Sequence, residues 1–140
     1  MKNSLSALDF FSAKLAYEIT PEDLASAQAM GTSPIVVDTR PTEAWCESRI
    51  PGALTIPSVD VAERAPHVLD DEDTDIVLYA WGADDHHAAR AAIVLLKLGY
   101  TQVRELSGGL EAWQREGFTL ETDVGRIHEL LPGLDAPLAG

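Results

Sequence analysis

Two short apolar runs, each followed at once by a polar loop, constrain the fold of this chain more than any other feature. They are Ile35–Asp38, with the sequence IVVD, and Ile76–Tyr79, with the sequence IVLY. Because neither run alternates apolar with polar residues, each is typical of a strand buried on both faces of a parallel sheet. Helical patterns separate and follow these strands. The chain is therefore predicted to be an α/β protein, with a mostly parallel central sheet of about five strands flanked by helices on both faces.

The remaining elements are predicted from apolar spacing and from residues that begin or end helices. Shorter strands are expected at Leu54–Ile56 and Val103–Leu106. Helices are expected at Ser6–Glu18, from Pro21 to Gly31 after a Thr20 cap, at Pro41–Glu47, at His86–Leu98 and at Leu110–Glu116. The apolar face of the helix at His86–Leu98 is expected to consist of Ala89, Ala92, Ile93, Leu95 and Leu96.

The length and composition predict one domain. The chain has 140 residues, of which 46% are apolar, enough to bury a hydrophobic core. Residues 1–18 are expected to form an N-terminal helix, and residues 19–120 the α/β domain. Residues 121–140 are expected to form an acidic tail with a short helix near Val124–Leu131.

The charge and the cysteine content exclude several classes of function. A net charge of −13 opposes binding to nucleic acid and to anionic lipid surfaces. No apolar run approaches the roughly 20 residues that span a membrane, and the N-terminal segment has no secretory signal pattern, so a cytoplasmic location is expected. The sole cysteine, Cys46, allows neither an internal disulfide nor a zinc site built of thiolates. We expect no metal and no cofactor.

The chemistry is expected beyond the carboxyl ends of the strands, where ligands of open parallel sheets bind. Two strand ends carry polar groups there, namely Asp38–Arg40 and the loop Ala80–His87. That loop leads from a strand into a helix, so its backbone amides and the helix dipole favour an anion. A cysteine at its start would have a lowered thiol pKa and a raised reactivity. As written, the loop contains no nucleophile.

At this point the sequence resembles the rhodanese-like domain family, over roughly Ile19 to Thr119. The matching segments, in order, are Ile35–Arg40, Arg49–Ala53, Ile56–Pro57, Ile76–Tyr79, Leu98–Tyr100 and Leu106–Trp113. The resemblance implies a single-domain sulfurtransferase, in which a cysteine directly after Ile76–Tyr79 takes sulfane sulfur from thiosulfate or a persulfide. A thiol acceptor or cyanide then removes it. The resemblance also implies that Asp38 and Arg40 support the architecture around the active loop.

The position that matches the cysteine is Ala80, whose methyl group cannot form a persulfide. The expected active-site loop continues with Trp81, Gly82, Ala83, Asp84, Asp85, His86 and His87. Two interpretations of Ala80 stay open. The chain is either a natural pseudoenzyme, which the acidic Asp84 and Asp85 favour, or a sulfurtransferase whose cysteine was replaced, which Trp81 and Gly82 favour because some family members continue with Trp-Gly after the cysteine.

Three functions are weighed against one another. The first is a sulfurtransferase-type domain that is inactive as written, with a small sulfur-containing anion or a thiol acceptor as partner. The alternative is a non-catalytic pseudo-rhodanese that binds or regulates a protein partner or a second copy, through the acidic loop or the apolar N-terminal helix. A phosphatase is disfavoured, because the loop has no arginine between Ala80 and Arg90 that could close around a phosphate. His86 and His87 are interpreted as a solvated helix start, not as metal ligands.

Overall fold

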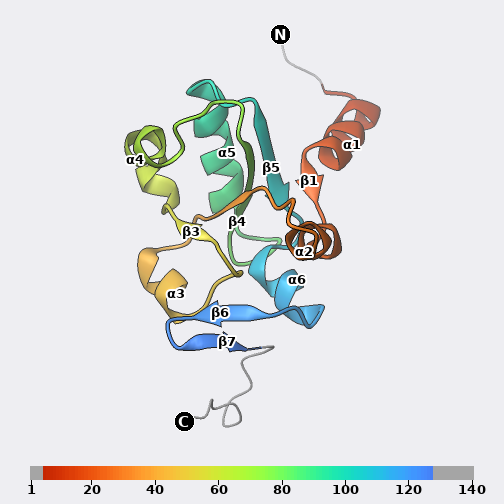
Figure 1. The fold of residues 1–140 in the computed structure, drawn as a ribbon. Helices are drawn as coiled ribbons and strands as arrows, with labels where there is room; N and C mark the ends of the chain where they lie inside the picture. Colours follow the sequence, from red (N-terminus) through yellow and green to blue (C-terminus); the bar gives the residue numbers. More distant parts are fainter. Residues whose placement is uncertain (1–4, 128–140) are drawn as a thin grey trace.

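The computed structural model describes residues 5–127 and arranges them around a five-stranded, wholly parallel sheet (Figure 1). The strand order is β1-β5-β4-β2-β3. The strands are β1 (Glu18–Ile19), β2 (Ile35–Asp38), β3 (Leu54–Thr55), β4 (Asp75–Tyr79) and β5 (Gln102–Leu106). The predicted α/β class is confirmed. Because β4 lies in the middle of the sheet, its apolar run is buried on both faces.

Helices lie on both faces of this sheet. The helical elements of the described residues are α1 (Ala7–Ala16), α2 (Pro21–Ala29), α3 (Thr42–Glu47), the 3₁₀ turn η1 (Ser58–Asp60), α4 (Val61–Val68), α5 (His87–Lys97) and α6 (Gly109–Arg115), of which α1 covers neither face. Successive residues of β4 point to opposite faces of the sheet and pack into two separate hydrophobic cores. Ile76 and Leu78 pack with α4 and α5, whereas Val77 and Tyr79 pack with α2 and α6. This two-sided packing fixes β4, and so fixes the loop that follows it.

The helix after the loop forms as predicted, but its predicted apolar face is only partly correct: Leu95 is buried and Ala92 packs against the core, whereas Ile93 and Leu96 do not belong to it. In α5 the buried residues are Ala88, Ala91 and Leu95, while Ile93 and Leu96 are about half exposed, at 52% and 50%. The true core face is therefore rotated by about one residue from the predicted one. Two of the three buried side chains are alanines, which allow α5 to pack closely against the sheet, while Ile93 and Leu96 are left at the surface.

The short helix predicted near Val124–Leu131 is also wrong where the structure describes it. A hairpin forms instead, from β6 (Leu120–Thr122) and β7 (Gly125–Ile127). Arg49 and Glu121 exchange backbone hydrogen bonds of 3.0 and 2.8 Å, which hold the hairpin to the domain. The hydrogen bonds to a distant part of the chain stabilise a strand here, although the apolar spacing near Val124–Leu131 favours a helix. The rest of the predicted tail, residues 128–140, lies outside the described residues.

The N-terminal helix α1 forms as predicted, yet it buries none of its residues. Leu8 and Leu15 are 76% and 83% exposed, so this helix contributes nothing to the hydrophobic core described for residues 5–127. Within the same described range, no helix is long and apolar enough to span a membrane.

Candidate functional site

Ala80 directly follows the central strand and lines a pocket of about 310 Å³. Only 3% of Ala80 is exposed. From the predicted loop, the pocket is lined by Ala80, Gly82, Ala83, Asp85 and His86. Its other walls come from α1, β1, α5 and the end of β5, through Lys14, Glu18, Ala89 and the stretch from Glu105 to Gly109. The structure thus brings five of the eight predicted loop residues to one pocket, whereas Trp81, Asp84 and His87 are not among the residues that line it.

The backbone of this loop rests directly on the start of α6. The amides of Leu110 and Glu111 donate to the carbonyls of Ala80 and Trp81, at 2.9 and 2.8 Å. Gly109 has a positive φ of 62°, and a Cβ there would lie 2.7 Å from the carbonyl oxygen of Ala80. The close approach therefore requires glycine. The Leu110 and Glu111 amides at the start of α6 are thus occupied by carbonyl oxygens of the loop.

Asp85 is the carboxylate that organises the loop. Its Oδ2 accepts from the Trp81 amide at 3.1 Å, and its Oδ1 accepts from the His87 amide at 3.0 Å. The His87 ring nitrogen Nδ1 lies 2.5 Å from the same Oδ1. Burial opposes the charged form of Asp85, but the hydrogen bonds from His87 and Trp81 outweigh burial and lower the pKa of its carboxyl group. Asp84, by contrast, is exposed.

We expect the pKa of Asp85 to appear in the backbone amides that it binds. The amide proton shifts of Trp81 and His87 should titrate with a midpoint below 3.8, the ordinary aspartate value. Because the folded-state pKa is lowered, the stabilisation from ionised Asp85 is present above the ordinary pKa and is lost as the pH falls through the lowered one. Solution NMR between about pH 2 and 6 measures this. A midpoint at or above 3.8, or an unchanged titration in Asp85→Asn, contradicts it.

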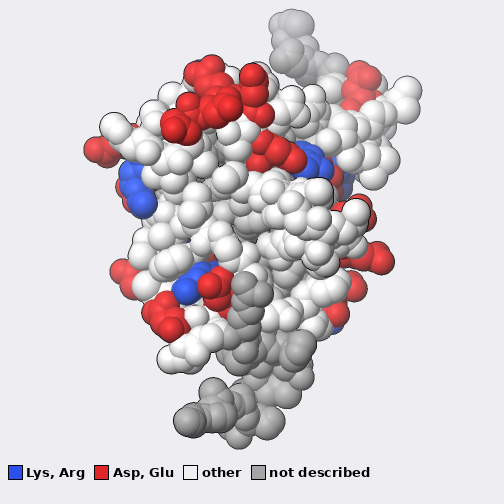
Figure 2. Space-filling model, viewed as in Figure 1, with Lys and Arg blue, Asp and Glu red and all other residues white. Residues whose placement is uncertain are grey.

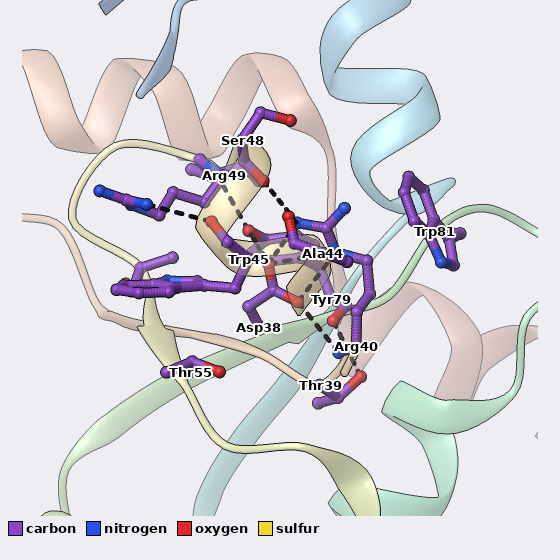
Figure 3. A network of polar contacts seen from close by, with 12 residues as sticks. Asp38, Thr39, Arg40, Ala44, Trp45, Ser48, Arg49, Thr55, Tyr79 and Trp81 are labelled. Atoms are coloured by element: carbon purple, nitrogen blue, oxygen red, sulfur yellow. Dashed lines mark hydrogen bonds and ion pairs between the residues drawn. The ribbon is translucent and has the colours of Figure 1, made fainter. Parts of the chain in front are cut away.

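Asp38 and Arg40 lie together in a buried network beside the pocket, not inside it (Figure 3). Arg40 donates to Asp38 through Nε, at 3.0 Å, and through Nη2, at 2.7 Å. Arg40 Nη2 also donates to the Ser48 carbonyl at 2.6 Å. The Tyr79 hydroxyl donates to Asp38 at 2.6 Å and accepts from the Ile50 amide at 3.1 Å. Asp38 thereby joins β2, β4 and the turn after α3.

Arg40 does not supply an exposed cation at the mouth of the loop. Arg40 is only 1% exposed. The Trp81 ring covers its guanidinium group, with 4.4 Å between the guanidinium carbon and the ring centroid. Burial lowers the pKa of Arg40, but the contact with Asp38 outweighs it and raises that pKa. Burial and the Asp38 charge together hold the pKa of Tyr79 well above its ordinary value. Arg40 therefore stays charged and holds the framework under Trp81.

The pocket is lined by more acids than bases. Glu18, Asp85 and Glu105 face it, against Lys14 and His86. Lys14 is itself paired with Glu18 at 2.9 Å. Burial, followed by the Glu18 charge, raises the pKa of Glu105. Acidic side chains also outnumber basic ones on the face seen in Figure 2.

Several residues that sequence reasoning missed belong to this site. Tyr79 and Glu105 were predicted only as strand residues, and Glu18 was predicted to end the N-terminal helix, whereas the structure places it in β1. The parallel pairing of Glu18 with Glu105 brings both to the carboxyl edge of the sheet. No local pattern signals that pairing, since β1 has only two residues. Cys46 is exposed on α3 and is not one of the pocket residues.

Arg49 and Trp113, at the ends of two of the segments that match the family, also have defined places in the structure. Arg49 stacks on Trp45, with 4.1 Å between guanidinium carbon and ring centroid, and pairs with Asp123 at 3.1 Å. It therefore ties the hairpin to α3. Trp113 is 2% exposed and fills the core between α6 and the sheet, as predicted.

The fold and the loop define a single α/β domain with a small pocket at the carboxyl end of its central strand. The sequence model of the rhodanese-like domain family matches residues 20–116. The chain therefore belongs to the rhodanese-like domain family.

Relatives of this chain include sulfurtransferases. It is 29% identical over 108 residues to a sulfurtransferase of Allochromatium vinosum, with 77% of this chain and 97% of that protein covered. It is 28% identical over 104 residues to the adenylyltransferase and sulfurtransferase UBA4 of Candida albicans, of which it spans only 23%. A solved structure, the BH2092 protein of Bacillus halodurans, is similar with a TM-score of 0.76 and 35% identity, over 85% of this chain and 86% of that one.

Proposed function

We propose that this chain is a sulfurtransferase-type rhodanese-like domain that forms no persulfide, because Ala80 stands at the position of the nucleophile. The observation that carries the proposal is the place of Ala80, directly after the central strand and in the lining of a pocket at the carboxyl edge of the sheet. A methyl group has no lone pair with which to attack a sulfane sulfur. The named sulfurtransferases among the relatives support the same class of chemistry.

The proposal is tested by restoring the thiol. We expect A80C, made in a Cys46→Ser background, to gain one sulfur atom by intact-protein mass spectrometry after incubation with a sulfane sulfur donor. The donors are thiosulfate and 2-aminoethyl persulfide, used separately. The single variant Cys46→Ser is the matched control, because it keeps Ala80 and has no thiol. If neither donor adds sulfur to the folded A80C variant, the proposal is wrong.

A non-catalytic binding module is the second candidate, and the occupied amides of the loop favour it. The carboxylate of Asp85 already accepts from Trp81 and His87, so the loop is held together without a ligand. The same experiment separates the two candidates. A folded A80C variant that never takes up sulfur favours the binding module. The codon for residue 80 in the natural gene then distinguishes a natural pseudoenzyme from a replaced cysteine.

A further inference from the structure

The loop that should hold an anionic sulfur already holds an anion of its own. The Asp85 carboxylate accepts from the Trp81 amide through Oδ2 at 3.1 Å, and from the His87 amide through Oδ1 at 3.0 Å. The side chain of Asp85 is only 14% exposed, although the two hydrogen bonds themselves lie at the surface of the domain. The amide of Trp81 at the start of the loop and the amide of His87 at the start of α5 therefore already donate to a side chain of the loop itself.

This carboxylate lies very close to the reactive position. The Trp81 nitrogen that it binds is bonded directly to the carbonyl carbon of Ala80, so one peptide unit separates the carboxylate from the residue-80 side chain. Both Ala80 and Asp85 line the same pocket. A thiolate at position 80 would therefore meet a like charge at short range, and a like charge raises a thiol pKa.

We propose that Asp85 is the specificity-determining residue of this loop, which makes it reject dianionic donors such as thiosulfate and favour neutral or cationic alkyl persulfides. This inference rests on the proposed sulfurtransferase function. The rest of the pocket acts in the same direction. Glu18 and Glu105 add carboxylates, and Lys14 is already paired with Glu18 at 2.9 Å. His86 is the other basic residue among those that line the pocket.

The favoured step needs no further reactant. The thiolate at position 80 attacks the outer sulfur of the donor R–S–SH, and a new S–S bond forms as the donor's own S–S bond breaks. The alkyl thiolate R–S⁻ leaves with that electron pair, and the outer sulfur keeps its proton. With thiosulfate, the same attack would release sulfite, and three negative charges would gather beside Asp85.

The test compares two variants of the A80C/C46S protein, D85N and D84N, each of which removes one negative charge. In D85N the charge beside the thiol is lost, while the amide oxygen can still accept from Trp81. D84N is the matched control, because Asp84 is the exposed neighbour and carries the same charge. The thiol pKa is measured from thiolate absorbance against pH. Sulfur uptake is then timed separately with thiosulfate and with 2-aminoethyl persulfide.

We expect D85N to lower the thiol pKa by about one unit, which raises the thiolate fraction near neutral pH about tenfold. The ratio of the thiosulfate rate to the persulfide rate should also rise about tenfold, whereas D84N should change both readouts less than about twofold. Equal effects of D85N and D84N would overturn the inference. Asp85→Ser serves as a second variant if D85N does not fold.

The two proposals fail in different ways. If no donor adds sulfur to any variant, the sulfur-transfer function is wrong, yet the absorbance titration still reports whether Asp85 raises the thiol pKa. If A80C takes up sulfur from thiosulfate as fast as D85N does, the function stands and the role of Asp85 is wrong.

Discussion

Replacing Arg40 with methionine is expected to lower the free energy of unfolding by about 3–5 kcal/mol. The change removes the guanidinium that donates to Asp38 at 3.0 and 2.7 Å, in a pair whose side chains are both 0% exposed. The Asp38 carboxylate would then stay buried with the Tyr79 hydroxyl and a backbone amide as its remaining donors. Leaving one charge of a buried pair uncompensated is the costly case, much more than deleting both. Chemical denaturation measures the change.

The matched control for this change is Arg104→Met. Arg104 also pairs with an aspartate, Asp75, at 3.2 Å, but the two side chains are 32% and 52% exposed. An exposed pair of this kind contributes about 0–1 kcal/mol. The double variant Asp38→Asn/Arg40→Met should be less destabilised than the sum of its single variants, because the second change removes the stranded charge. An effect of Arg40→Met no larger than that of Arg104→Met would show that the network does not hold the site.

The framework of the domain could be predicted because its signals are local. The apolar run Ile76–Tyr79 has no polar face, and that alone indicates a central parallel strand. The polar loop after it must then lie at the carboxyl edge, where the pocket is found. The place of Ala80 follows from these two facts. The sequence therefore predicted the edge of the sheet at which the loop and its pocket lie.

The parts that could not be predicted depend on contacts between distant segments. The pattern at Val124–Leu131 indicated a helix, but the described part of it forms β7, since Glu121 of the preceding strand bonds to Arg49. Helix α4 contains Pro66, a residue that argues against a helix interior. Asp85 was predicted only as one acidic residue of the active-site loop. Nothing in the sequence shows that its carboxylate reaches back to the Trp81 amide, because that bond depends on the folded shape of the loop.

Replacing Gly109 with alanine is expected to lower the free energy of unfolding by about 2–4 kcal/mol. A left-handed backbone costs about 1 kcal/mol in any residue with a Cβ, and the added carbon at φ 62° would lie 2.7 Å from the Ala80 carbonyl oxygen and 2.9 Å from the Gly82 nitrogen. Both neighbours are backbone atoms, so the loop itself must move.

Gly117→Ala separates the two causes of this loss. Gly117 has φ 84° with nothing within 4 Å of an added Cβ, so its replacement should cost only about 1 kcal/mol. In the A80C background, Gly109→Ala should also abolish sulfur uptake, because it displaces the carbonyls of Ala80 and Trp81 from the amides of Leu110 and Glu111. Gly117→Ala should leave that uptake unchanged. Equal losses of stability in the two variants would mean that backbone strain alone, and not the contact with the loop, makes glycine necessary at position 109.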